Sequence, residues 1–292
     1  MATLRDIRNR IKAVKNTQKI TRAMKMVAAA RLRKAQENIL NARPYADNIE
    51  SLLSRALKET KVDISPLLIK KEKVSNVLIV IFSSDKGLCG SFNLNITKKA
   101  ISFSEELQKK GVAHIEFCPI GKKSKDYLKF RHFDVLEYNN GMFVKINPVQ
   151  SEAFAKFLID TYIKGEFDEI YLAYNKFKTV MTQVATIEKF LPLEFEEEKD
   201  QKKADINYIF EPDIDSIVVK IIEKYTKNKI WKALLESFAS EMGARMTAMD
   251  MATENAKELL RLLQIKFNKE RQAAITKEIL EVVSGANALK EK

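Results

Sequence analysis

The chain has 292 residues, of which 46% are hydrophobic and 31% are charged, and its formal net charge is +12. This composition indicates a globular protein with acidic partners, and its longest apolar run, residues 76–82, is far shorter than the ~20 residues that span a bilayer. Two cysteines exclude a disulfide framework and indicate a reducing compartment, while the arginines near the N-terminus exclude a secretory signal.

The first predicted element is a helix from Thr3 to about Lys58. Apolar residues recur in it at alternating steps of three and four, which predicts the seam of a coiled coil. These residues are Leu4, Ile7, Ile11 and Val14, then Ala28, Leu32, Ala35, Ile39, Ala42, Ala46, Ile49 and Leu53. Pro44 falls inside the helix, so we expect a kink or at least the loss of one backbone hydrogen bond.

This helix also carries most of the net charge. Through Arg43, twelve Lys and Arg residues stand against two acidic residues. They spread around the helix, with apolar and small residues between them. An ordinary surface helix has one apolar stripe and one polar face, whereas over residues 17–36 the charges of this helix do not keep to one side.

The middle of the chain, residues 74–208, has a different period. We predict strands over 74–84 and 113–121, a short strand over 133–138, and helices over about 94–110, 122–130 and 151–165. Residues 168–177 and 180–191 are predicted to form a hairpin. Strands that alternate with helices predict a mostly parallel sheet with helices on its faces.

The last section is predicted to be helical from Asp213, a candidate N-cap, to about Ser284. Its seam residues are Ala252, Ala256, Leu259 and Leu263 and, after a polar interval over 266–272, Ile275, Ile279 and Val282. The fold class is therefore α/β, with a long antiparallel coiled coil of the N- and C-terminal helices and an inserted Rossmann-like α/β domain. We expect the domains to cover 1–60, 74–208 and 211–288.

Matching the two seams predicts which residues face each other in this coiled coil. Val14 is expected near Val282, and Ile7 near Leu289. The polar interruptions at 18–25 and 266–272 then fall side by side.

The loop after the first strand, "SSDKGLCGSFN", is the one candidate for phosphate binding. A glycine-containing loop that opens a helix can hold phosphate through its free N–H groups. However, only Gly87 and Gly90 are present, and neither a G-x-x-x-x-G-K-[ST] nor a G-x-G-x-x-G pattern occurs. We interpret the loop as a tight turn and Cys89 as a small packed residue. His114 and His132 lie apart from any ligand cluster, so no metal site is predicted.

Two other functions fit parts of the sequence. The basic N-terminal helix is compatible with a nucleic-acid-binding protein, although its first 43 positions lack aromatic residues. A Rossmann-like enzyme with helical dimerisation arms is the other alternative. Salt-sensitive binding of nucleic acid would support the first, and saturable nucleotide binding the second.

Three blocks of the sequence resemble the γ subunits of F-type ATP synthases. They are "RDIRNRIKAVKNTQKITRAMKMVAAARLRKAQ", "SSDKGLCGSFN" and "SEMGARMTAMDMATENAKELL" with "NKERQAAITKEILEVVSGANAL". The resemblance implies a rotor whose paired terminal helices stand inside a ring of α and β subunits, with the α/β domain beside the ε subunit and the c-ring. It implies no catalytic site, cofactor, metal or nucleic acid in this chain, because catalysis belongs to the ring.

The resemblance also implies the contact residues. Arg271, Gln272 and Thr276, with Lys19 and Met24 nearby on the other helix, match positions that contact a β-subunit loop. Arg43, Tyr45, Tyr208 and Glu211 match positions at the c-ring and the ε subunit. A shaft in a cavity meets protein on all sides, which would explain the apolar residues around the basic helix.

Two expectations concern regulation and location. The family's chloroplast members carry a redox-active cysteine pair in the middle domain, and we expect no such control because no cysteine follows Cys118. The N-terminus lacks a transit extension, which favours a bacterial protein. It is expected on the cytoplasmic face of the inner membrane, held there only through the complex.

Overall fold

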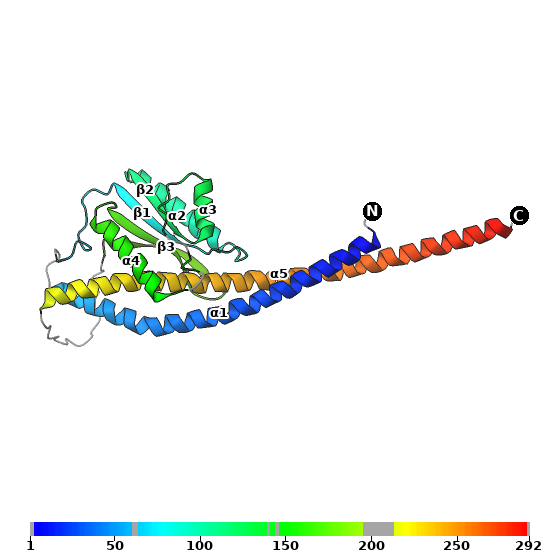
Figure 1. The fold of residues 1–292 in the computed structure, drawn as a ribbon, viewed down its shortest axis with the longest axis horizontal. Coiled ribbons are helices and arrows are strands. Elements are labelled where there is room, and N and C mark those ends of the chain that lie inside the picture. Colours follow the sequence, from blue (N-terminus) through cyan, green and yellow to red (C-terminus); the bar gives the residue numbers. More distant parts are fainter. Residues whose placement is uncertain (1–2, 60–63, 139–140, 144–145, 195–212, 291–292) are drawn as a thin grey trace. The chain divides into compact units, whose positions relative to one another are not determined.

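The computed structural model describes residues 3–59, 64–138, 141–143, 146–194 and 213–290 (Figure 1). Its elements in chain order are α1 (Leu4–Glu59), β1 (Asn76–Phe82), α2 (Phe92–Lys109), β2 (His114–Ile120), α3 (Lys122–Phe130), α4 (Pro148–Ile163), β3 (Glu169–Phe177), β4 (Gln183–Leu191) and α5 (Ile214–Lys290). The chain is thus a mixed α/β protein with a long helix at each end, as the sequence predicted.

The strands form one sheet in the order β2-β1-β3-β4. β1 pairs parallel with both β2 and β3, and β4 pairs antiparallel with β3 through the predicted hairpin. β1 occupies the centre and is apolar along almost its whole length, because both of its faces are covered. The predicted strand over 133–138 is wrong: Val135 makes only an isolated bridge to Phe117.

Alternate residues of β1 enter two different hydrophobic cores. Val77, Ile79 and Ile81 pack with α2 and α3, whereas Leu78, Val80 and Phe82 pack with α4 and the first part of α5. This alternation follows from the period of two in a strand. We refer to the sheet with α2, α3 and α4 as the α/β domain.

The ends of the long helices follow local rules. Asp213 caps α5 as predicted, since its Oδ1 accepts a hydrogen bond from Ser216 N at 2.8 Å, and this bond holds the pKa of Asp213 below its usual value. α1 continues through Pro44 without ending. At its start, Thr3 and Asp6 exchange hydrogen bonds that satisfy the first turn.

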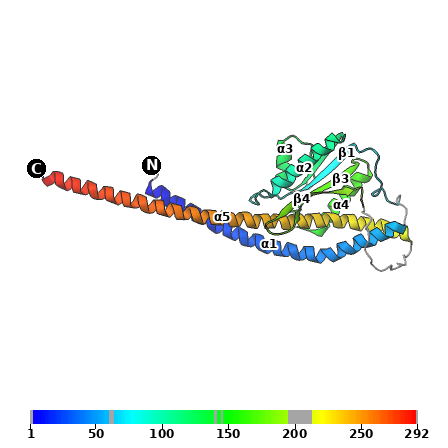
Figure 2. The same ribbon diagram turned by 180° about the vertical axis from the view of Figure 1, so that it is seen from behind.

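The residues divide into two compact units, and both long helices contribute to each. Unit 2 comprises residues 29–245 and holds the α/β domain. Within it, Leu32, Ala35 and Ile39 of α1 pack against Leu235, Ala239 and Met242 of α5. Figures 1 and 2 show the two helices side by side along this stretch.

Unit 1 comprises residues 1–28 and 246–292. Its helices are antiparallel: the hydroxyls of Thr21 and Thr253 are 2.8 Å apart, and the Arg8 guanidinium lies 5.6 Å from the centre of the Phe267 ring. Interpolation between these pairs places Val14 level with about Leu260.

The predicted pairing of Val14 with Val282, and of Ile7 with Leu289, is therefore wrong by about three heptads. A shift by whole heptads leaves the seam in phase, so periodicity alone cannot distinguish the two registers. The polar interruptions at 18–25 and 266–272 do not face each other either. Residues 18–25 lie beside the segment around Asp250 and Thr253 instead.

Candidate functional site

The predicted contact residues on α5 lie on its exposed surface. Arg271, Gln272 and Thr276 are all exposed. The Thr276 hydroxyl donates a hydrogen bond to the backbone carbonyl of Gln272 at 3.0 Å, one turn earlier. This bond occupies the hydroxyl, so the guanidinium of Arg271 and the amide of Gln272 are the two groups best placed to bind another molecule.

The structure does not bring Lys19 and Met24 to these residues. Lys19 is exposed and Met24 is half-buried, and both lie beside the part of α5 around Thr253. Arg271 lies 18 residues beyond Thr253 along that helix, which corresponds to roughly 27 Å. The five residues therefore form two separate candidate contacts.

The predicted residues at the other end of α1 are only partly described. Arg43 and Tyr45 lie within α1, and the Tyr45 side chain is 54% exposed. Tyr208 and Glu211 lie outside the described residues.

Unit 1 has a surface that the sequence alone could not define. Where the two helices pair with each other, apolar side chains remain exposed on both: Ile20, Met26, Val27, Met251, Leu259, Leu262 and Ile265. Five more are exposed on α5 beyond the level at which α1 begins: Ile275, Ile279, Leu280, Val282 and Val283. Positively charged residues such as Arg22 lie among those of α1. These exposed apolar side chains make unit 1 a candidate interaction surface.

In unit 2, the loop between β1 and α2 is fixed by a residue that the sequence did not reveal. Arg245 of α5 donates hydrogen bonds to the backbone carbonyls of Gly87 at 2.6 Å and Lys86 at 3.4 Å. It also forms an ion pair with Glu241, whose side chain is only 6% exposed. Burial raises the pKa of Glu241, and Arg245 opposes that shift.

The rest of this loop is held by its own polar groups. Asn93 accepts a hydrogen bond from Ser84 N at 2.9 Å, and the Ser84 hydroxyl donates to Lys86 O at 2.6 Å. Cys89 is buried beside them, and this burial raises the pKa of its thiol. A buried thiol with a raised pKa is a poor nucleophile, which agrees with the interpretation of Cys89 as a packed residue.

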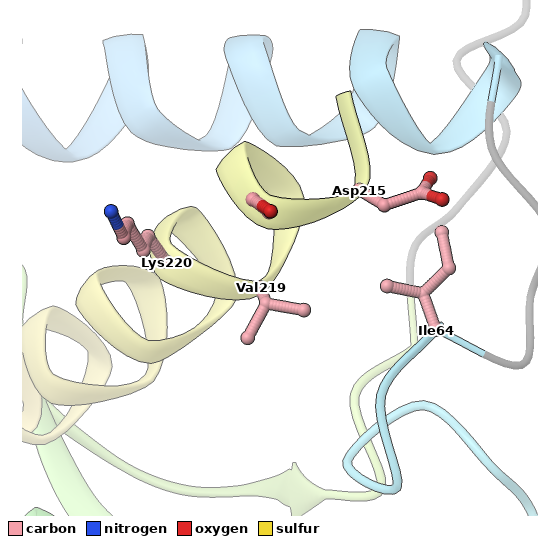
Figure 3. A pocket seen from close by; sticks show the side chains of 5 residues that line it. Ile64, Asp215, Val219 and Lys220 are labelled. Carbon is pink, nitrogen blue, oxygen red and sulfur yellow. The ribbon is translucent and has the colours of Figure 1, made fainter. Parts of the chain in front are cut away.

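A hollow of about 520 Å³ lies at the beginning of α5 (Figure 3). Its lining consists of Ile64, Asp215, Ser216, Val219 and Lys220. In Figure 3, Asp215 and Lys220 lie at opposite ends of the hollow. Its charged groups therefore do not converge on one point, as the polar groups of a cofactor site do. Among the described residues, no group of three His, Cys, Asp or Glu side chains is arranged to hold a metal ion.

Comparison with known proteins identifies the family. The ATP synthase family model matches residues 3–289. The ATP synthase gamma chain of Geotalea uraniireducens is 44% identical over 290 residues, which cover 99% of this chain and 100% of the relative. That of Chlorobaculum parvum is 41% identical over 293 residues and covers 100% of both chains. The chain belongs to the ATP synthase γ-chain family.

Solved structures confirm the fold expected of a γ chain. A chain of the Euglena gracilis mitochondrial ATP synthase rotor superposes with a TM-score of 0.64 at 20% identity, over 93% of this chain and 98% of that one. A chain from the central stalk and c-ring of the Tetrahymena thermophila enzyme gives a TM-score of 0.55 at 23% identity, over 80% and 99%.

None of the described helices is long and apolar enough to cross a bilayer.

The γ-chain sequence contains a signal for the ion pair of Glu241 and Arg245. Two opposite charges four residues apart, inside a helix of small and apolar residues, are placed to pair with each other and with buried backbone.

Proposed function

We propose that this chain is the central shaft of a rotary ATP synthase. It turns inside the ring of α and β subunits and couples ion-driven rotation of the c-ring to conformational changes at the β catalytic sites, without a catalytic site of its own. Besides the family, one structural observation supports this proposal. The two helices of unit 1 expose apolar side chains although they are paired with each other.

The exposed apolar surface has a physical cost in water of about 25 cal/mol per Å². A cavity lined by protein on all sides removes that cost at any angle of the shaft. The basic residues of α1 suit acidic loops on such a lining. By contacting different ring conformations differently, the shaft shifts their populations through a coupling of binding free energies.

We assign the contact with a β-subunit loop to Arg271 and Gln272, with Thr276 beside them. A guanidinium can bind a carboxylate through two parallel hydrogen bonds, and an amide both donates and accepts. Lys19 and Met24 form a second contact at a different height of the shaft, because they lie beside Thr253.

The opposite end of α1 is assigned to the base of the complex. Arg43 and Tyr45, with Tyr208 and Glu211, contact the ε subunit and the c-ring, and the complex holds the chain at the cytoplasmic face of the membrane. In this arrangement residues 1–60 and 211–288 form the shaft, and residues 74–208 form the foot. The alternative of a basic nucleic-acid-binding protein is not supported by the comparisons.

The proposal is tested by reconstitution with the α, β and ε subunits and the membrane sector. The complex with this chain should synthesise ATP when an ion gradient is imposed, and the complex without it should not. Isolated, the folded chain should bind no ATP tighter than about 100 μM by calorimetry. Failure of synthesis by a fully assembled complex would refute the shaft function.

The contact assignment needs its own variants. Arg271→Ala with Gln272→Ala should leave the chain folded but weaken assembly or ATP synthesis, because a charge-assisted contact worth about 1.5–3 kcal/mol is lost. Arg261→Ala with Gln264→Ala is the matched control, since it removes the same two residue types from exposed positions of the same helix. Equal rates for both double variants would show that Arg271 and Gln272 make no special contact.

A further inference from the structure

One turn of α5 in unit 2 is hydrogen-bonded to the backbone of the sheet. Glu236 Oε2 accepts a hydrogen bond from Phe177 N at 2.8 Å, and the Ser240 hydroxyl donates to Asn175 O at 2.8 Å. Both helix side chains are buried. They are one turn apart on the same helix face, and both reach the carboxyl end of β3.

Two further contacts extend this attachment. The buried hydroxyl of Ser237 donates to Phe82 O at the end of β1, at 3.3 Å. Gly243 lies against the turn between β3 and β4, where an added Cβ would come within 3.3 Å of Val180 O. Glycine thus permits a close approach of the helix to this turn. We call Glu236, Ser237 and Ser240, with their backbone partners, the joint.

The neighbouring face of α5 is different in kind. There Leu235, Ala239 and Met242 pack against α1 through apolar contacts. Apolar packing has no directional requirement, and similar residues recur each turn, so such a contact tolerates small shifts along or around the helix. A hydrogen bond loses strength within a few tenths of an ångström or a few tens of degrees.

We propose that the joint fixes the rotational position of α5 relative to the sheet, with Glu236 as its main positioning residue. Torque that enters through the α/β domain then passes to α5 through directional bonds, and α1 follows through apolar contacts. This inference rests on the proposed shaft function. Glu236 carries most of the joint because it is a buried carboxylate on a backbone N–H, and bonds to charged groups are the stronger ones.

The test compares two substitutions of Glu236 in the reconstituted complex. Glu236→Met keeps the length of the side chain but removes the acceptor, whereas Glu236→Gln retains an acceptor oxygen. Thr226→Val is the matched control, because it removes a buried hydroxyl bond within α5 that does not reach the sheet. The readouts are hydrogen exchange at the Phe177 amide and the number of ions pumped per ATP hydrolysed.

In Glu236→Met, the Phe177 amide should exchange at least about tenfold faster, as expected for loss of a bond to a charged acceptor. Ions pumped per ATP should fall while hydrolysis continues. Glu236→Gln, whose acceptor oxygen is uncharged, should change both readouts less than Glu236→Met does, and Thr226→Val should change neither. If Glu236→Met does not assemble, Ser240→Ala removes the second bond of the joint with a smaller change in volume, and the same loss of pumping is expected.

Three results would overturn the proposal: faster exchange at Phe177 with unchanged pumping, equal losses in Glu236→Gln and Glu236→Met, or an equal loss in Thr226→Val. Each would make Glu236 a residue of stability alone. The wild-type complex separates this failure from that of the shaft function. If it does not couple ATP hydrolysis to pumping, the shaft function fails whatever the variants do.

Discussion

The two parts of α5 have different surroundings, although they belong to one continuous helix. Between Ile214 and Arg245 its apolar side chains enter the cores of unit 2, and buried polar groups such as Glu236 and Ser240 bond to the sheet. From Met246 onward the helix lies in unit 1, where large apolar residues such as Ile279 and Val282 are more than half exposed.

This contrast shows which interactions hold the chain together and which are available to other molecules. In the first part, the partners of each buried side chain are in the same chain. In the second part, α1 pairs with one side of the helix as far as about Arg271, and large apolar side chains remain exposed both along this stretch and beyond it. Substitutions in the first part should therefore change stability, and those in the second should change assembly.

The largest effect is expected at the buried ion pair. Arg245→Ala leaves the Glu241 carboxylate buried without its partner, which typically costs about 3–5 kcal/mol. Arg261→Ala is the control, because its ion pair with Glu258 is exposed and contributes little. Urea unfolding of the isolated chain measures both. A similar midpoint for the two variants would contradict the difference between the two parts of α5.

Substitutions of apolar residues should also affect stability differently in the two parts of α5. Leu234 is fully buried among α4, α5 and the sheet, so Leu234→Ala should cost about 2–5 kcal/mol of unfolding free energy. Ile279 is 57% exposed, and Ile279→Ala should change the stability of the isolated chain by less than about 0.5 kcal/mol. In the reconstituted complex we expect Ile279→Ala to weaken assembly more than Leu234→Ala does, because Ile279 then contacts a partner. A large loss of stability from Ile279→Ala would refute this account.

A smaller effect is expected at Asp168, which joins the start of β1 to the loop before β3. Burial tends to raise the pKa of this carboxyl, but hydrogen bonds from Lys71 and from the Asn76 and Ser75 amides hold it below its usual value. A lowered folded-state pKa means stability that is present above the unfolded pKa of about 3.9 and is lost as pH falls through the folded pKa.

Asp168→Asn should therefore cost about 1.5–3 kcal/mol at neutral pH, the value of hydrogen bonds to a charged group. The difference from the wild type should narrow as the pH falls below about 4. Unfolding free energies measured from pH 3 to 7 test this sign. A difference that stays constant across the range would show that the charge of Asp168 contributes nothing.

The sequence predicted most of the fold because its local signals are strong. The apolar run of β1, the hairpin of β3 and β4, and the Asp213 cap each depend on residues close together in the chain. Residues 133–138 do not form a strand, because Val135 pairs with a single residue of β2, Phe117. The contact residues were predicted from the family resemblance alone. The distance along the shaft between Arg271 and the pair Lys19 and Met24 follows only from how α1 and α5 are paired in the structure.

The register could not be predicted because a heptad repeat specifies phase and not position. Val14 can face Val282 or a residue about three heptads earlier with nearly the same seam geometry. What selects the observed pairing is polar and specific: Thr21 against Thr253, and Lys25 against Asp250. Likewise, the joint at Glu236 depends on backbone atoms of a distant strand, and no spacing in the sequence indicates it.

The smallest perturbation tests this register directly. Thr21→Cys with Thr253→Cys should form an intramolecular disulfide on mild oxidation, because the two hydroxyls are 2.8 Å apart and the bridge requires neighbouring Cβ atoms. Val14→Cys with Val282→Cys should not, since Val14 lies level with about Leu260. Both pairs leave the folded chain almost unchanged, so the cross-link reports position rather than stability.

The native thiols of Cys89 and Cys118 are buried, and a variant lacking both excludes their participation. Gel mobility under non-reducing conditions distinguishes the two registers. A disulfide between positions 14 and 282, without one between positions 21 and 253, would support the register predicted from the seams alone. It would also contradict the separation of Arg271 and Gln272 from Lys19 and Met24 along the shaft.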